Sequence, residues 1–101
     1  MPYINLSTSA KVNDKDKLLE EISILISSLT KKSRRFVMAK IDDNCQIYFD
    51  DVTPSCFIEI KSIGFLNPSK MAKPISDFVY EKMGIPIDRI YISFELSLIH
   101  I

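Results

Sequence analysis

The sequence predicts an α+β sandwich in which two repeated β-α-β units form a four-stranded sheet with two helices on one face. Apolar and polar residues alternate over residues 2–8 and 56–62, as in half-buried strands. Between such segments, apolar residues recur every three or four positions, as on one face of a helix. With 101 residues, the chain is expected to form a single domain, 1–101.

The first predicted helix follows the first strand. Asn13 is its expected N-cap, and Asp14 and Asp16 would place negative charge in the first turn, where the helix dipole favours it. The apolar face consists of Leu18, Leu19, Ile22, Leu25, Ile26 and Leu29.

The second predicted helix ends at Gly84, because glycine readily adopts the left-handed conformation that closes helices. Pro74 lacks a backbone N–H, so the helix is expected either to begin near Pro74 or to be kinked there. Its apolar face consists of Met71, Ile75, Phe78, Val79 and Met83.

Further strands are predicted over residues 36–41 and 89–96, with a short extra strand at 46–49. The two halves align without a gap, since Ile4 matches Ile58 (58 − 4 = 54) and Arg35 matches Arg89 (89 − 35 = 54). We interpret this as an internal duplication of residues 2–41 and 56–95.

The sheet face that the helices leave open is predicted to be apolar. Exposed to water, it would form a large hydrophobic patch, so a symmetric oligomer is expected to bury it.

Charge and composition argue against several classes of partner. Thirteen basic and thirteen acidic side chains cancel, so no overall field attracts nucleic acid or a membrane surface. There is no apolar run near 18 residues and no signal peptide, so we expect a cytoplasmic protein. Cys45, Cys56 and the single histidine, His100, do not form a metal-binding pattern, so no metal and reduced thiols are expected.

Pro2 is the first candidate catalytic residue. Removal of Met1 would expose a secondary amine at the start of a strand. An apolar pocket and a nearby cation would both lower the pKa of this amine, which could then remove a proton at neutral pH. Alternatively, Pro2 is simply a chain end, since proline is common at the second position.

Two further segments could bind an anion. Residues 31–35 hold four cations, which would attract a carboxylate or, alternatively, only complement the dipole of the preceding helix. Gly64 permits a tight turn that would leave the Ile63 amide free to bind an anion. Alternatively, a glycine at this position more commonly marks an ordinary turn between a strand and a helix. Phe36 is expected to point inward, which argues against a nucleic-acid surface.

Four segments together resemble the macrophage migration inhibitory factor family of the tautomerase superfamily. They are Met1-Pro2, Thr30-Lys31-Lys32, residues 60–64 and residues 88–92. The resemblance implies a homotrimer whose sheets line a central barrel, with three pockets at the subunit boundaries. It also implies cofactor-free keto–enol tautomerisation of small α-keto acids such as phenylpyruvate, or of dopachrome-like compounds.

The resemblance also implies a role for each site residue. Pro2 would be the base and then the acid, Lys32 would bind the substrate carboxylate or carbonyl oxygen, and the Ile63 amide would assist it. Tyr91 would come from a neighbouring subunit, and Ser93 stands where the family has asparagine.

Two features of the family are unmatched. Cys56 is followed by Glu59 three residues later, so the family's CxxC and its thiol oxidoreductase activity are not carried over. Family chains also continue beyond the position of Ile101 with an aromatic-containing tail that closes the pocket.

Two alternatives to the enzyme stay open at this point. The first is a cytokine-like protein that binds a receptor after secretion without a signal peptide. The second is a catalytically impaired relative that lacks the pocket-closing tail.

Overall fold

The computed structural model describes residues 2–63 and 66–97 of the chain. Its elements are β1 (Tyr3–Thr8), α1 (Lys15–Thr30), the 3₁₀ turn η1 (Arg34–Phe36), β2 (Met38–Asp42), β3 (Cys56–Ile63), α2 (Pro68–Met83), the 3₁₀ turn η2 (Ile87–Arg89) and β4 (Ile90–Ser97).

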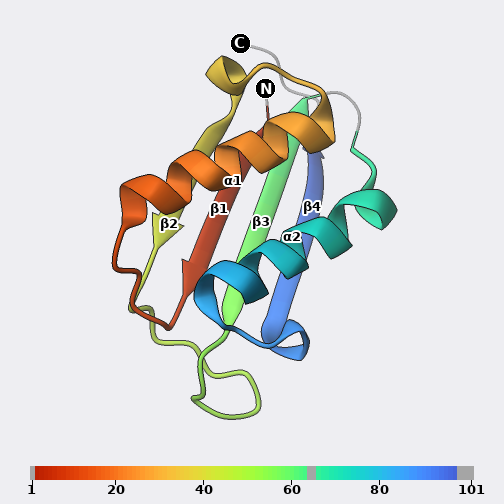
Figure 1. Ribbon diagram of the computed structural model, residues 1–101. Coiled ribbons are helices and arrows are strands. Elements are labelled where there is room, and N and C mark those ends of the chain that lie inside the picture. The colour runs from red at the N-terminus through yellow and green to blue at the C-terminus, as the bar shows by residue number, and fades with distance from the viewer. Residues whose placement is uncertain (1, 64–65, 98–101) are drawn as a thin grey trace.

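The four strands form one mixed sheet in the order β2-β1-β3-β4. β1 pairs in parallel with β2, β3 pairs in parallel with β4, and the two central strands β1 and β3 are antiparallel. Both helices cross the same face of this sheet (Figure 1). The predicted α+β sandwich of two β-α-β units is therefore confirmed.

The core lies between the helices and the central strands. Ile4 and Leu6 of β1 pair with Ile60 and Ile58 of β3, so their side chains project from one face of the sheet. All four are at most 1% exposed. The helices contribute Ile22, Ile26, Met71, Ile75 and Val79 to the same cluster.

The first helix begins one residue later than the sequence predicts. Asp14 is the N-cap, and its Oδ1 accepts a hydrogen bond of 3.1 Å from the Lys17 amide. The assignment of Asn13 as the N-cap is therefore wrong. Asparagine and aspartate cap equally well, and the position was decided by which carboxylate or amide oxygen reaches a free N–H of the first turn.

This difference predicts unequal effects of two neighbouring substitutions. Asp14→Ala is expected to lower the free energy of unfolding by about 1 kcal/mol, because one amide of the first turn loses its acceptor. Asn13→Ala serves as the matched control and should leave stability within about 0.5 kcal/mol of the wild type. Urea unfolding would measure both, and equal losses would contradict the assignment of Asp14.

The second helix begins at Pro68, six residues before Pro74, and continues through that proline. The expectation that it begins near Pro74 is wrong, because Pro68 at the first helical position supplies the start. Gly84 ends the helix at φ 70°, as predicted.

Among the described residues, no helix has both the length and the apolar character that a membrane span requires.

Residues 46–49 do not form the predicted extra strand. The segment between β2 and β3 contains only an isolated bridge between Phe49 and Asp51. Phe36 belongs to η1 and not to a strand, and it is 49% exposed, which corrects the expectation that it points inward.

The open face of the sheet is mainly polar, which corrects the prediction of an apolar face. Strand alternation and register place there the polar side chains of Asn5, Ser7, Lys40, Asp42, Glu59, Lys61, Ser93 and Glu95. Tyr3, Met38, Phe57 and Tyr91 are the apolar and aromatic members of this face. The isoleucines that make the strands look apolar almost all face the helices.

Candidate functional site

Pro2 lies at the head of β1, where three strands meet. Its side chain is less than 2% exposed, and its carbonyl accepts a hydrogen bond of 3.0 Å from the Met38 amide at the start of β2. Because Tyr3 pairs with Lys61 in the antiparallel β1–β3 ladder, the last residues of β3 lie at this same end. The backbone of Ile63, which ends β3, is therefore close to Pro2, whereas Gly64 lies outside the described residues.

Lys32 follows the end of α1. Lys31 adopts the left-handed conformation (φ 57°), which ends the helix and turns the chain, and the Lys32 amide donates to the Ser27 carbonyl at 3.2 Å. The segment after α1 lies at the same end of the sheet as the N-terminus (Figure 1). Lys32 itself is exposed.

A hollow of about 320 Å³ lies beside Lys32, between the end of α1 and the start of α2. Among the described residues, its lining includes Lys31, Lys32 and Lys70, together with Asn67 at the N-cap of α2, and no carboxylate. Three ammonium groups near a helix N-terminus make this region attractive to an anion.

Tyr91 and Ser93 lie away from Pro2. Tyr91 pairs with Phe57, which pairs in turn with Ser7, five residues along β1 from Pro2. At about 3.3 Å per residue, Tyr91 and Pro2 are separated by roughly 16 Å along the strands. A single chain therefore brings Pro2, Lys32 and the Ile63 backbone to one end and leaves Tyr91 and Ser93 outside that group.

Tyr91 is 61% exposed and borders a groove of about 200 Å³. Its ring contacts that of Phe57 at a centroid distance of 5.7 Å and an angle of 55°. Tyr48 and Phe49, from the loop of residues 43–55, form another part of the lining. We call this space the Tyr91 groove.

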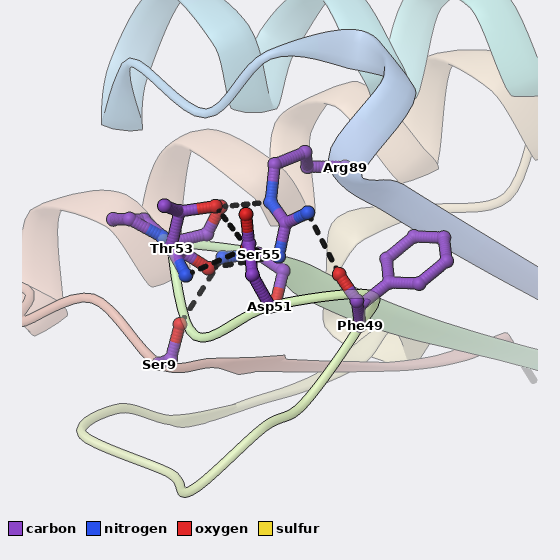
Figure 2. Close-up of polar contacts among 7 residues, drawn as sticks. Ser9, Phe49, Asp51, Thr53, Ser55 and Arg89 are labelled. Carbon is purple, nitrogen blue, oxygen red and sulfur yellow. Dashed lines mark hydrogen bonds and ion pairs between the residues drawn. The ribbon is translucent and has the colours of Figure 1, made fainter.

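Arg89, to which the sequence assigned no role, connects η2 to that loop. Its guanidinium donates hydrogen bonds to the carbonyl oxygens of Phe49 (2.8 Å), Thr53 (2.9 Å) and Pro54 (3.1 Å). It also forms an ion pair of 3.2 Å with Asp51, and Figure 2 shows these contacts converging on one side chain. They join residues 35 to 40 positions apart, so no local sequence signal could have revealed them.

Cys56 adds no reactive thiol to the described site. Burial raises the pKa of the Cys56 thiol to about 12, so it remains protonated and unreactive at neutral pH. Within residues 2–63 and 66–97, no cluster of three or more His, Cys, Asp or Glu side chains could hold a metal ion. His100 lies outside the described residues.

Comparisons with known proteins agree with the fold. The family described as macrophage migration inhibitory factor (MIF) matches residues 1–98. A macrophage migration inhibitory factor homolog from Trichinella spiralis is 31% identical over 99 residues, which cover 93% of this chain and 87% of the relative. The crystal structure of a homologue from Prochlorococcus marinus is 33% identical, covers 92% of this chain and 86% of its own, and has a TM-score of 0.87.

A second solved structure gives the same result. The Trichinella spiralis factor superposes with a TM-score of 0.86 at 28% identity, covering 94% of this chain and 88% of its own.

Proposed function

Because the chain belongs to the macrophage migration inhibitory factor family, within the tautomerase superfamily, we propose that it is a keto–enol tautomerase that uses Pro2 as its base. The observation that carries this proposal is the position of Pro2, buried at a strand end beside the Ile63 backbone and at the same end of the sheet as the segment that follows α1. The substrates we propose are small α-keto acids of the phenylpyruvate type, or dopachrome-like compounds.

The proposed reaction transfers only protons. With Met1 removed, the Pro2 amine takes a proton from the carbon beside the substrate carbonyl, and the released electron pair forms the C=C bond while negative charge develops on oxygen. That oxygen then gains a proton to give the enol, and the reverse sequence regenerates the ketone. No electrons are gained or lost overall, so the proposed steps need no cofactor.

Lys32 and the Ile63 amide would stabilise the charge that develops on the substrate. An ammonium group or N–H directed at a developing oxyanion lowers the barrier, and one such donor is worth about 3–4 kcal/mol in well-studied enzymes. The lysine-lined hollow next to Lys32 supports binding of the substrate carboxylate at this end.

We further propose that the complete site forms between subunits of a homotrimer. Within one chain Tyr91 is displaced from Pro2 by roughly 16 Å along the strands, so Tyr91 and Ser93 would reach the substrate from a neighbouring copy. The polar open face supports the proposed barrel, because side chains such as Lys61 and Glu95, paired at 3.8 Å, suit a surface in contact with water. We place this activity in the cytoplasm.

A receptor-binding role is the second candidate. The relatives are named for inhibiting macrophage migration, and Tyr48 and Val52 of the 43–55 loop are 77% and 78% exposed, available to a partner. Such a role would require the protein to leave the cell that makes it.

An activity assay tests the proposed enzyme. The purified protein would be checked by intact mass for loss of Met1 and by sedimentation for the trimer, and phenylpyruvate enol would be followed by its ultraviolet absorbance. We expect ketonisation well above the rate in buffer. No activity in processed, trimeric protein would overturn the enzymatic proposal and favour the receptor-binding role or an impaired relative.

A further inference from the structure

Arg89 holds the middle of the 43–55 loop. Its side chain is only 16% exposed, and its three hydrogen bonds end on backbone carbonyls of one short segment, residues 49–54. A planar guanidinium with five N–H donors can satisfy several acceptors at once, whereas the ammonium of lysine is a single point charge.

The loop has few other contacts to fix residues 49–54. Its first residues are held by β1, through the Cys45 amide to the Thr8 carbonyl at 2.9 Å, and its last by the Ser55 amide to Ser9 Oγ at 3.1 Å. Between these anchors, the contacts described within the loop itself are the Phe49–Asp51 bridge and the hydrogen bonds from Thr53 to Asp51, and Asp50 is left-handed (φ 67°). Among the described contacts, those of Arg89 therefore contribute most to fixing the middle of the loop relative to the sheet.

Asp51 completes this arrangement. Its carboxylate accepts hydrogen bonds from the Thr53 hydroxyl and amide, at 2.6 and 2.9 Å, and pairs with Arg89. The Thr53 hydrogen bonds, followed by the charge of Arg89, hold the pKa of Asp51 below its ordinary value, so this carboxylate is ionised at neutral pH.

The position of the loop determines the shape of the Tyr91 groove. Phe57 and Tyr91 line the groove from the sheet, whereas Ile47, Tyr48 and Phe49 line it from the loop. Phe49 is held twice by Arg89, through its carbonyl and through its ring, whose centroid lies 5.4 Å from the guanidinium carbon. Movement of residues 49–54 would change the surroundings of Tyr91 directly.

We propose that Arg89 is a positioning residue, which holds the loop side of the Tyr91 groove in place and so sets the affinity for the apolar part of the substrate. This inference rests on the proposed function, in which Tyr91 contributes to the site of a neighbouring copy. Arg89 acts through Phe49 and Tyr91, without contact with the substrate and without a part in the proton transfer at Pro2.

The test compares three substitutions in the processed, full-length protein. Arg89→Met removes all the contacts, Arg89→Lys keeps the charge, and Asp51→Asn keeps the three carbonyl bonds but loses the ion pair. Lys73→Met is the control, because Lys73 lies on the exposed side of α2 and pairs only with Asp77 in the described structure. Phenylpyruvate kinetics and amide hydrogen exchange over residues 43–55 would be measured for each.

We expect Arg89→Met to raise KM about tenfold with kcat within about twofold of the wild type, the pattern of a lost binding contribution. Arg89→Lys and Asp51→Asn should give smaller increases in KM than Arg89→Met. Hydrogen exchange in the loop should likewise rise most in Arg89→Met and less in the other two variants. Unchanged hydrogen exchange in Arg89→Met would overturn the positioning role. Faster exchange with an unchanged KM would overturn the effect on affinity, and so would a fall in kcat as large as the expected rise in KM. If the wild type had no activity, both the proposed function and the effect of Arg89 on affinity would be overturned. The hydrogen-exchange data would still show whether Arg89 holds the loop.

Discussion

Pro2→Gly is expected to lower kcat/KM for phenylpyruvate by about 100-fold or more, the range that a positioned base contributes to a proton transfer. Glycine keeps an N-terminal amine once Met1 is removed, but this amine is primary and lacks the ring that is buried at the head of β1. It would therefore be less well fixed in front of the substrate. Initial rates over a range of substrate concentrations would measure the loss.

Pro2→Ala, compared in parallel, separates the chemistry of the amine from the flexibility of glycine. Both variants must show wild-type thermal unfolding for the comparison to hold. If both variants retained the kcat/KM of the wild type, neither the secondary amine nor the ring of Pro2 would be needed for catalysis, and the proposed role of Pro2 would be wrong.

Ile58→Ala is expected to cost about 2–5 kcal/mol of the free energy of unfolding, the typical loss when a buried isoleucine is truncated. Ile58 is 0% exposed and pairs with Leu6 at the centre of the sheet, where a cavity has few ways to close. Urea unfolding at fixed protein concentration would measure it, since oligomerisation makes apparent stability depend on concentration.

The matched control for Ile58→Ala is Ile24→Ala, the same substitution at a helix position that is 46% exposed. Its expected cost is below about 1 kcal/mol, because less apolar surface is lost from the core. Equal losses at the two positions would contradict the assignment of the core to the helix-facing side of the sheet.

Much of the fold could be predicted because hydrophobic spacing is a local signal. The apolar face of α1 and the alternation around Ile4 and Ile58 identify the elements and the order in which they occur. Helix starts were less accurate: Asn13 and Asp14 are adjacent capping residues, and Pro68 and Pro74 compete as the start of α2. The internal duplication stays a prediction.

The polarity of the open sheet face was predicted wrongly because it depends on which residues of different strands lie on the same side of the sheet. Asn5, Glu59 and Ser93 lie in one row across three strands, a relation fixed by register and invisible in any single segment. Exposure of Phe36 was missed for a similar reason, since it falls in a 3₁₀ turn where strand alternation does not apply.

The candidate site could be predicted only in part from the sequence. Pro2 and Lys32 stand out by position and charge, and their placement at one end follows from the topology. The contacts of Arg89 with residues 49–54 depend on how a loop without regular structure folds back on η2, which local propensity does not specify.

The role of the Pro2 amine as the base is tested most directly by comparing the chain that has lost Met1 with the chain that retains it, separated and verified by intact mass. Retained Met1 makes the Pro2 nitrogen an amide, which cannot accept a proton at neutral pH, while the rest of the sequence is unchanged. We expect only the chain without Met1 to accelerate phenylpyruvate tautomerisation. Equal activity in the two forms would show that the Pro2 amine is not the base.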